Sequence, residues 1–289
     1  MQYSFLKRLT WLHRDDIRPY IFVRPENRIQ HPGRLHTGID WFSDEPIYKN
    51  PLAMDEVGFA DLIYELEGKA FGQMGMAMPR WVFYDCGIIP GFVAGFAART
   101  DSLPSVVRDV LVGHKNCEWI PLSLFITIPT MGKGEWVAHN LCSINSLIPK
   151  PSRYYGLGFM TKAFGLWYAN IDILCGITQW GSPALRLHSN YGYFEILTSY
   201  TPVHSYAKTL TYRAKIRVEH WPRFFTDEDD PEFDRLFEKT GLLVDPKSEE
   251  NLKAMQRRLE NKQEPLFLSA KEIRTARLDA ELNVYRFKS

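Results

Sequence analysis

The segment from Pro151 to Met160, PSRYYGLGFM, constrains the fold of this chain more than any other stretch. Its two glycines, Gly156 and Gly158, follow a proline-broken loop and precede a run of helix formers. The first turn of a helix presents unpaired backbone N–H groups and a partial positive charge, and glycines allow a ligand to approach that backbone closely. The segment therefore predicts a phosphate-binding strand–loop–helix unit or, alternatively, a plain turn into a helix whose small residues pack closely.

The overall composition is that of a soluble globular protein. The chain has 289 residues, 45% of them hydrophobic and 24% charged, which is enough for a sizeable core. Its formal net charge of +1 gives no electrostatic reason to expect a nucleic-acid partner. The longest apolar run, residues 86–98, is too short to cross a bilayer and contains a proline and three glycines, so we expect no membrane span.

The cysteines bear on metal binding and on the compartment. The four of them lie far apart and form no CxxC pair, so the sequence predicts no metal site. The charged start of the chain lacks the apolar run of a secretory signal, so we expect free thiols in a reducing cytoplasm.

Charge density and periodicity predict three parts. These are residues 1–52, an irregular extension packed on the core; residues 53–218, the main domain; and residues 219–289, a charged helical extension. In the last part we expect helices over 249–262 and 270–284, whose thin apolar seams dock on the main domain or on a second copy in a homo-oligomer. The acidic run 226–230 is interpreted as a solvated loop rather than a cation site.

The middle of the chain alternates between helical and strand-like patterns. It predicts a helix over 55–71, strands over 80–86, 91–99, 119–128 and 136–146, a helix over 156–169, a strand over 171–178, a helix over 183–191, and strands over 193–200 and 208–218. Residues 88–91 are read as the turn between the first two strands. This order indicates an α/β (α+β) fold with a central mixed, mostly antiparallel sheet flanked by helices.

The short helix over 183–191 has clear boundary signals. Ser182 is a natural N-cap, Pro183 suits the first helical position, and Gly192 is expected to end the helix in a left-handed conformation.

Two motifs in this order resemble the GNAT superfamily of N-acyltransferases. Arg153-x-x-Gly156-x-Gly158 is similar to the R/Q-x-x-G-x-G/A loop that opens the family's pyrophosphate-binding helix. The stretch from Ala184 to Tyr193 is similar to its later A-L-x-L-Y-x-x-x-G-F helix, and residues 85–96 resemble its second and third strands. The resemblance covers residues 80–200.

The chain departs from the family pattern at two positions. Gly181 stands where an asparagine commonly starts the last helix, and His188 stands where a tyrosine is often the general acid. The family's tyrosine donor therefore has no direct counterpart at this position.

The resemblance implies an acyl-CoA-dependent N-acyltransferase. Such an enzyme moves an acetyl or other acyl group from acetyl-CoA or a longer acyl-CoA to an amine on a small molecule or peptide, by direct attack and without a metal. The family grips pantetheine through main-chain groups, which by position fall at Ser146, Leu147 and Ile148. The pyrophosphate would be held by the amides of Tyr154, Tyr155, Gly156, Leu157 and Gly158, with Arg153 as side-chain support.

Three residues are candidates for proton transfer. His188 occupies the family's tyrosine position, and its ordinary pKa near 6.5 suits a donor to the departing thiolate, although it could equally be a helix histidine bonded to a carbonyl. Glu135 and His139 are four apart on a predicted strand, so they share a face, and either could accept the amine proton. Glu135 could instead be an edge carboxylate and His139 a hydrogen-bonded core ring. Cys142 is expected to face away from His139, which disfavours a Cys–His nucleophile pair.

Two other functions fit the same fold. A non-catalytic binding or assembly module is favoured by the two departures from the family pattern. A nucleic-acid-modifying member is disfavoured by the near-zero net charge.

Overall fold

The computed structural model describes residues 4–12, 14–30, 42, 45–82, 85, 91–111, 117–201, 208–226, 228–261 and 264–288. They belong to two compact units, Met1–Ile171 and Asp172–Ser289, and each unit is described by itself. This division lies at neither of the boundaries expected from the sequence, which follow residues 52 and 218. Within the described ranges, no helix combines the length and the hydropathy needed to cross a membrane.

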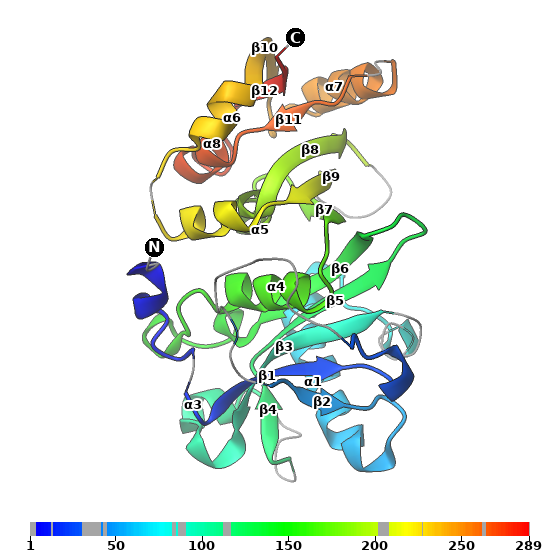
Figure 1. Cartoon of the computed structure of the whole chain (residues 1–289), viewed down its shortest axis with the longest axis vertical. Coiled ribbons are helices and arrows are strands. Elements are labelled where there is room, and N and C mark those ends of the chain that lie inside the picture. Colours follow the sequence, from blue (N-terminus) through cyan, green and yellow to red (C-terminus); the bar gives the residue numbers. More distant parts are fainter. Residues whose placement is uncertain are drawn as a thin grey trace. The chain divides into compact units, whose positions relative to one another are not determined.

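The first unit is built on a sheet with the strand order β6-β5-β3-β1-β2, and β4 also pairs with β3 (Figure 1). All of these pairs are antiparallel except β1 with β2. The strands are β1 (Ile17–Phe22), β2 (Ile47–Lys49), β3 (Phe92–Arg99), β4 (Trp119–Pro121), β5 (Ser123–Pro129) and β6 (Glu135–Ser143). The α-helices are α1 (Val57–Phe71), α3 (Ser105–Arg108) and α4 (Leu157–Tyr168). The 3-10 helices are η1 (Ser4–Arg8), η2 (Pro25–Asn27), η3 (Met54–Glu56), η4 (Gly72–Met74), η5 (Thr100–Ser102), η7 (Ile144–Ser146) and η8 (Lys150–Ser152).

Helix α4 packs on the sheet through a face made of small and apolar residues. Thr161 donates a hydrogen bond to Ser123 on β5 over 2.6 Å, and a Cβ added at Gly165 would lie 2.6 Å from the ring of Phe125. Residues 123 and 125 are two apart on a strand and therefore point to the same face. Helix α1 packs against β4 and β6.

The N-terminal part is more regular than the sequence predicts. Strands β1 and β2 extend the sheet, where an irregular extension was expected. The reason is a nearly continuous buried run from Ile17 to Phe22, which pairs with β3 along its whole length.

The second unit contains an antiparallel sheet with the order β10-β12-β11-β8-β9-β7 (Figure 1). Its strands are β7 (Ile173–Gln179), β8 (Gly192–Thr198), β9 (Thr209–Ile216), β10 (Phe237–Val244), β11 (Phe267–Leu268) and β12 (Leu282–Phe287). Its helices are α5 (Pro183–His188), η9 (Ser189–Tyr191), η10 (Val218–Phe224), α6 (Pro231–Leu236), α7 (Glu249–Asn261) and α8 (Ala270–Thr275).

The C-terminal region corrects the expectation of a helical extension. Helix α7 agrees with the prediction, but the helix expected over 270–284 ends at Thr275, and β12 begins at Leu282. Strands β10, β11 and β12 continue the sheet beside β8, around a core of Tyr193, Phe233, Phe237 and Phe267. The apolar seam of α7 is already used in this unit, because Leu252 and Met255 are buried.

Most of the predicted middle elements are present, with two corrections. Residues 80–82, expected to start a strand, are helical, and the turn expected at 88–91 lies, apart from Gly91, outside the described residues. Gly192 is extended (φ 168°) rather than left-handed, and glycine is required there because a Cβ would lie 1.8 Å from the carbonyl oxygen of Lys215. The predicted mixed α/β architecture, a mainly antiparallel sheet flanked by helices, is confirmed.

Candidate functional site

The glycine-rich loop and its helix have the predicted order. Strand β6 leads through η7 and η8 to α4, whose N-cap is Gly156. Gly156 has φ 71°, in the left-handed region that glycine adopts without strain. The N–H of Gly158 falls in the first turn, where helix geometry leaves no intrahelical carbonyl to accept it. The start of α4 therefore offers the partial positive charge and main-chain donors that an anion requires.

One side chain fixes the shape of this loop. Asn145 Nδ2 donates to the carbonyl of Tyr154 over 2.7 Å, and the Tyr154 N–H donates to Asn145 Oδ1 over 2.9 Å. The Leu157 N–H also donates to the Tyr154 carbonyl, over 3.2 Å. Two of the five amides expected to hold pyrophosphate, those of Tyr154 and Leu157, are thus bonded within the protein.

The N-terminal segment packs on the same loop. Trp11 Nε1 donates to the carbonyl of Tyr155 over 2.7 Å, and the Arg8 guanidinium lies 4.9 Å from the centre of the Tyr155 ring. Arg153 is exposed and its Nε donates to the carbonyl of Ile148 over 3.3 Å. Arg8 and Arg153 therefore place positive charge beside the start of α4.

The residues expected to hold pantetheine lie where β6 has just ended. Ser146 closes η7, the Leu147 N–H donates to the carbonyl of Ile144 over 2.8 Å, and Ile148 is buried. The chain therefore leaves the sheet at Ser143, before the end of the strand predicted over 136–146.

Strand β6 carries a β-bulge near its middle. Phe125 on β5 pairs with Leu141 on β6, and Thr127 pairs with Ala138. One residue of β5, Ile126, therefore lies opposite two residues of β6, His139 and Asn140. A bulge leaves one backbone N–H without a ladder partner and turns both bulged side chains toward one side of the sheet. His139 and Asn140, adjacent in sequence, consequently meet, with His139 Nδ1 3.3 Å from Asn140 Oδ1.

The bulge corrects the expectation for Cys142. Residues paired across strands share a face, and Cys142 pairs with Leu124 whereas Ala138 pairs with Thr127. Leu124 and Thr127 are three residues apart and point to opposite faces of the sheet, so Cys142 and Ala138 do as well. Cys142 therefore lies on the face opposite Ala138, which is the face of Glu135 and Val137. Burial, and secondarily the charge of Glu67, raises the pKa of the Cys142 thiol well above its ordinary value. A neutral thiol does not act as a nucleophile at neutral pH.

A buried carboxylate lies beside this bulge. Glu67 on α1 is fully buried and accepts from the Met78 N–H with both oxygens, over 3.0 and 3.1 Å. Its Oε1 also accepts from Asn140 Nδ2 over 2.7 Å. Burial raises the pKa of Glu67, and these hydrogen bonds oppose that effect.

The predicted acid–base residues occupy different environments. Glu135 lies at the start of β6, where Thr130 Oγ1 donates to its Oε1 over 2.9 Å across the β5–β6 turn. His139 is exposed at the bulge. His188 belongs to the second unit, where it ends α5, is 7% exposed, and stacks on Tyr212 with ring centres 5.4 Å apart.

The two predicted signals at the start of α5 are confirmed. Ser182 accepts from the Ala184 N–H as the N-cap, and Pro183 is the first helical residue.

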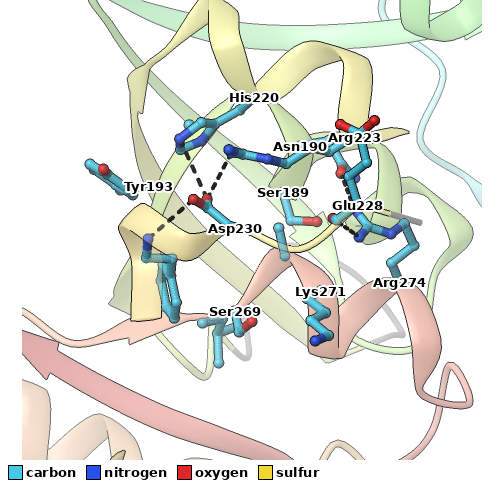
Figure 2. A pocket seen from close by; sticks show the side chains of 14 residues that line it. Ser189, Asn190, Tyr193, His220, Arg223, Glu228, Asp230, Ser269, Lys271 and Arg274 are labelled. Carbon is cyan, nitrogen blue, oxygen red and sulfur yellow. Dashed lines mark hydrogen bonds and ion pairs between the residues drawn. The ribbon is translucent and has the colours of Figure 1, made fainter. Parts of the chain in front are cut away.

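The second unit contains a small polar pocket, lined in part by Ser189 and Asn190 just after α5 (Figure 2). Its cavity volume is about 20 Å³, room for roughly one water molecule. Asp230 lies 2.8 Å from Arg223 Nη1 and 3.5 Å from His220 Nε2, and Arg274 Nη1 donates to Asn190 Oδ1 over 3.1 Å. These contacts join η10 to the N-cap of α6 and η9 to α8, so we interpret the pocket as a structural polar junction.

Among the described residues, one group of three side chains has the proximity of metal ligands. Single ligand atoms of Glu219, His220 and Glu232 lie within 4.8 Å of one another. The guanidinium of Arg217, however, donates to both Glu219 and Glu232, and so places a positive charge between the two carboxylates. We therefore assign this group to structure rather than to metal binding.

No protein-family model matches the chain, and no curated protein is similar to it in sequence. Among solved structures it is similar to the ribosomal-protein-S18-alanine N-acetyltransferase from Escherichia coli, at 12% identity and a TM-score of 0.37, covering 58% of this chain and 92% of that chain. It is also similar to a chain of the NatC complex bound to Gag peptide and CoA, at 11% identity and a TM-score of 0.37, covering 58% of this chain and 96% of that chain.

Sequence reasoning missed three residues of this site. Glu67 has a signal in the sequence, because it lies four residues after Ile63 on the apolar stripe of α1, where a charge is unexpected. Asn145 and Asn140 have no such signal, since their roles depend on a loop and a bulge that only the fold creates.

Proposed function

We propose that this protein is an acyl-CoA-dependent N-acyltransferase that transfers an acetyl or longer acyl group to a small-molecule or peptide amine. The observation that supports this most is the continuous assembly from the β6 bulge through the Asn145-held loop to the Gly156 N-cap of α4. The resemblance of Arg153-x-x-Gly156-x-Gly158 to the GNAT motif supports the same proposal.

The start of α4 would bind the CoA diphosphate. Its first-turn amides carry partial positive charge, and Gly156 and Gly158 leave that backbone uncovered by side chains. Arg153 and Arg8 would add side-chain charge, and the pantetheine arm would run past Leu147 and Ile148 toward β6.

The bulge would receive the thioester. A backbone N–H released from the ladder at His139–Asn140 can donate to the thioester carbonyl and stabilise the negative charge that develops on its oxygen. The amine nitrogen attacks the carbonyl carbon, the C–N bond forms, and the C–S bond breaks. His139 or Glu135 accepts the amine proton, and the departing thiolate takes a proton from water.

Turnover of acyl-CoA with a panel of amines tests this proposal. We expect release of free CoA thiol that depends on both the acyl-CoA and one class of amine, with acetyl-CoA and longer acyl-CoAs compared in parallel. A Gly158→Leu variant should lose this activity, because its side chain covers the first turn of α4. Gly72→Ala is the matched control, since a Cβ at Gly72 meets nothing within 4 Å.

A non-catalytic CoA-binding module is the second candidate, and the burial of His188 favours it. A histidine that is 7% exposed and stacked on Tyr212 has the environment of a core residue. Tight CoA binding without thiol release for any amine would support the module, and absence of both would refute the two candidates together.

A further inference from the structure

We propose that Glu67 and Asn140 are positioning residues that fix the tautomer of His139, so that His139 Nε2 carries the lone pair that accepts the amine proton. This inference rests on the proposed acyl transfer for its role and on the geometry of the first unit for its structure. It selects His139 rather than Glu135 as the base.

The first step is the orientation of the Asn140 amide. The Glu67 carboxylate accepts from the Met78 N–H with both oxygens and from Asn140 with Oε1. Asn140 donates from Nδ2 to Glu67 Oε1 over 2.7 Å, so its NH₂ is the group that faces the carboxyl. The other end of the amide, Oδ1, is thereby directed at His139.

The second step is the tautomer of His139. Asn140 Oδ1 lies 3.3 Å from His139 Nδ1, and a carbonyl oxygen only accepts. The hydrogen bond therefore requires the proton on Nδ1, which leaves Nε2 unprotonated in the neutral ring. A carboxylate thus acts on the imidazole through one intervening amide.

The bulge is what makes this contact possible. Successive side chains on a regular strand point to opposite faces, so residues 139 and 140 would not meet. Because both lie opposite one residue of β5, they turn to the same side, the side on which α1 supplies Glu67. The bulge would then both present a backbone N–H to the thioester and assemble the base beside it.

In the reaction, the amine nitrogen forms the new C–N bond and loses its proton to His139 Nε2. The C–S bond breaks, and the thiolate leaves with a proton from water. His139 becomes a cation whose Nδ1–H is still accepted by the Asn140 carbonyl oxygen. The proton returns to solvent when the acylated amine leaves.

Nitrogen-15 NMR of the histidine rings tests the tautomer without any substrate, with His139→Gln used to assign the His139 signals. In the wild-type protein above the histidine titration we expect the proton on Nδ1. In Glu67→Leu, the Asn140 NH₂ loses its acceptor, so the Asn140 amide is no longer held in one orientation and the share of His139 rings with the proton on Nε2 should rise. Asn140→Leu removes the acceptor of the His139 Nδ1–H and should shift the tautomer in the same direction, which keeps the test available if Glu67→Leu folds poorly.

Two further variants separate positioning from a structural role. Glu65→Leu makes the same change on the same helix, at a residue that pairs with Lys69, and should leave the His139 signals unchanged. Glu67→Asp retains an acceptor and should keep the wild-type tautomer, even at lower thermal stability.

Kinetics then tests the role. Glu67→Leu and Asn140→Leu should lower kcat by about 10- to 100-fold, no more than the roughly 10²–10⁴-fold that a general base itself contributes, because the base remains but loses its orientation. CoA affinity should change little. A wild-type tautomer in both variants, or unchanged kcat in a protein that turns over acyl-CoA, would overturn the inference alone. Failure of the wild-type protein to turn over acyl-CoA with any amine would count against the proposed function, while the NMR result would still decide the tautomer.

Discussion

Asn145 holds both main-chain polar groups of Tyr154, donating from Nδ2 to the carbonyl over 2.7 Å and accepting the N–H with Oδ1 over 2.9 Å. This reciprocal pair spans the loop between β6 and α4. It fixes the backbone just before Gly156 and so sets the direction in which the first turn of α4 faces. The loop is therefore preorganised, and a ligand would not have to order it on binding.

Replacing Asn145 by leucine should weaken CoA binding by about tenfold or more. The change keeps the side-chain volume but leaves two main-chain groups without their partner, which costs about 1–3 kcal/mol. Isothermal titration with CoA measures the effect. Asn251→Leu is the matched control, because Asn251 also bonds two main-chain groups, at Asp245 and Leu243 in the second unit. It should lower stability without changing CoA affinity, and equal losses in both variants would contradict the role of Asn145.

Gly156→Ala should destabilise the protein and also reduce CoA affinity. The φ of 71° at this N-cap costs an alanine about 1–2 kcal/mol, and relief of that strain would shift the start of α4. Urea unfolding gives the free-energy change, with Gly72→Ala at φ −59° as the control that should be neutral or slightly stabilising. Wild-type stability for Gly156→Ala would show that the loop does not hold this conformation in solution.

Local signals in the sequence predicted the loop and the helices around it. Gly156, the helix formers after it, and the Ser182 N-cap act over a few residues, so α4 and the start of α5 could be placed without knowing the fold. The same reasoning failed for Gly192, whose requirement comes from the approach of Lys215 on another strand.

The remaining errors are non-local. The C-terminal strand β10 is only half-buried, and its consecutive polar residues 238–240 do not give the alternating pattern of a strand. The strand packs through Phe237, whose ring contacts those of Phe233 and Phe267. The bulge at His139–Asn140 depends on the register with β5 and leaves no pattern in β6 itself. For that reason Glu135 and His139 looked equivalent in the sequence, whereas only His139 lies at the bulge and contacts Asn140.

The second unit should lose stability as the pH falls from about 6.5 toward 4. Burial, opposed by the nearby Asp230 charge, lowers the pKa of His220 to about 4, so the folded state binds fewer protons than the unfolded state in this window. Urea unfolding at several pH values measures the slope, and His220→Gln should flatten it. An identical pH dependence in the two proteins would show that His220 does not control acid stability.

Phe237→Ala should destabilise the second unit by about 3–5 kcal/mol, the usual cost of removing a buried phenylalanine. Phe237 is 3% exposed and its ring stacks on that of Phe233 with centres 4.5 Å apart. Phe287→Ala serves as the control, because Phe287 is 48% exposed on the neighbouring strand and should cost much less. If the two substitutions lower the free energy of unfolding equally, the C-terminal strands are not part of the core.

The central claim is that the start of α4 binds the diphosphate of coenzyme A, and calorimetric titration of acetyl-CoA into the purified protein tests it most directly. The expected result is one acetyl-CoA per chain for the wild-type protein and for Gly72→Ala, with binding lost in Gly158→Leu. Absence of binding to the wild-type protein, or equal affinity in all three proteins, would contradict the account.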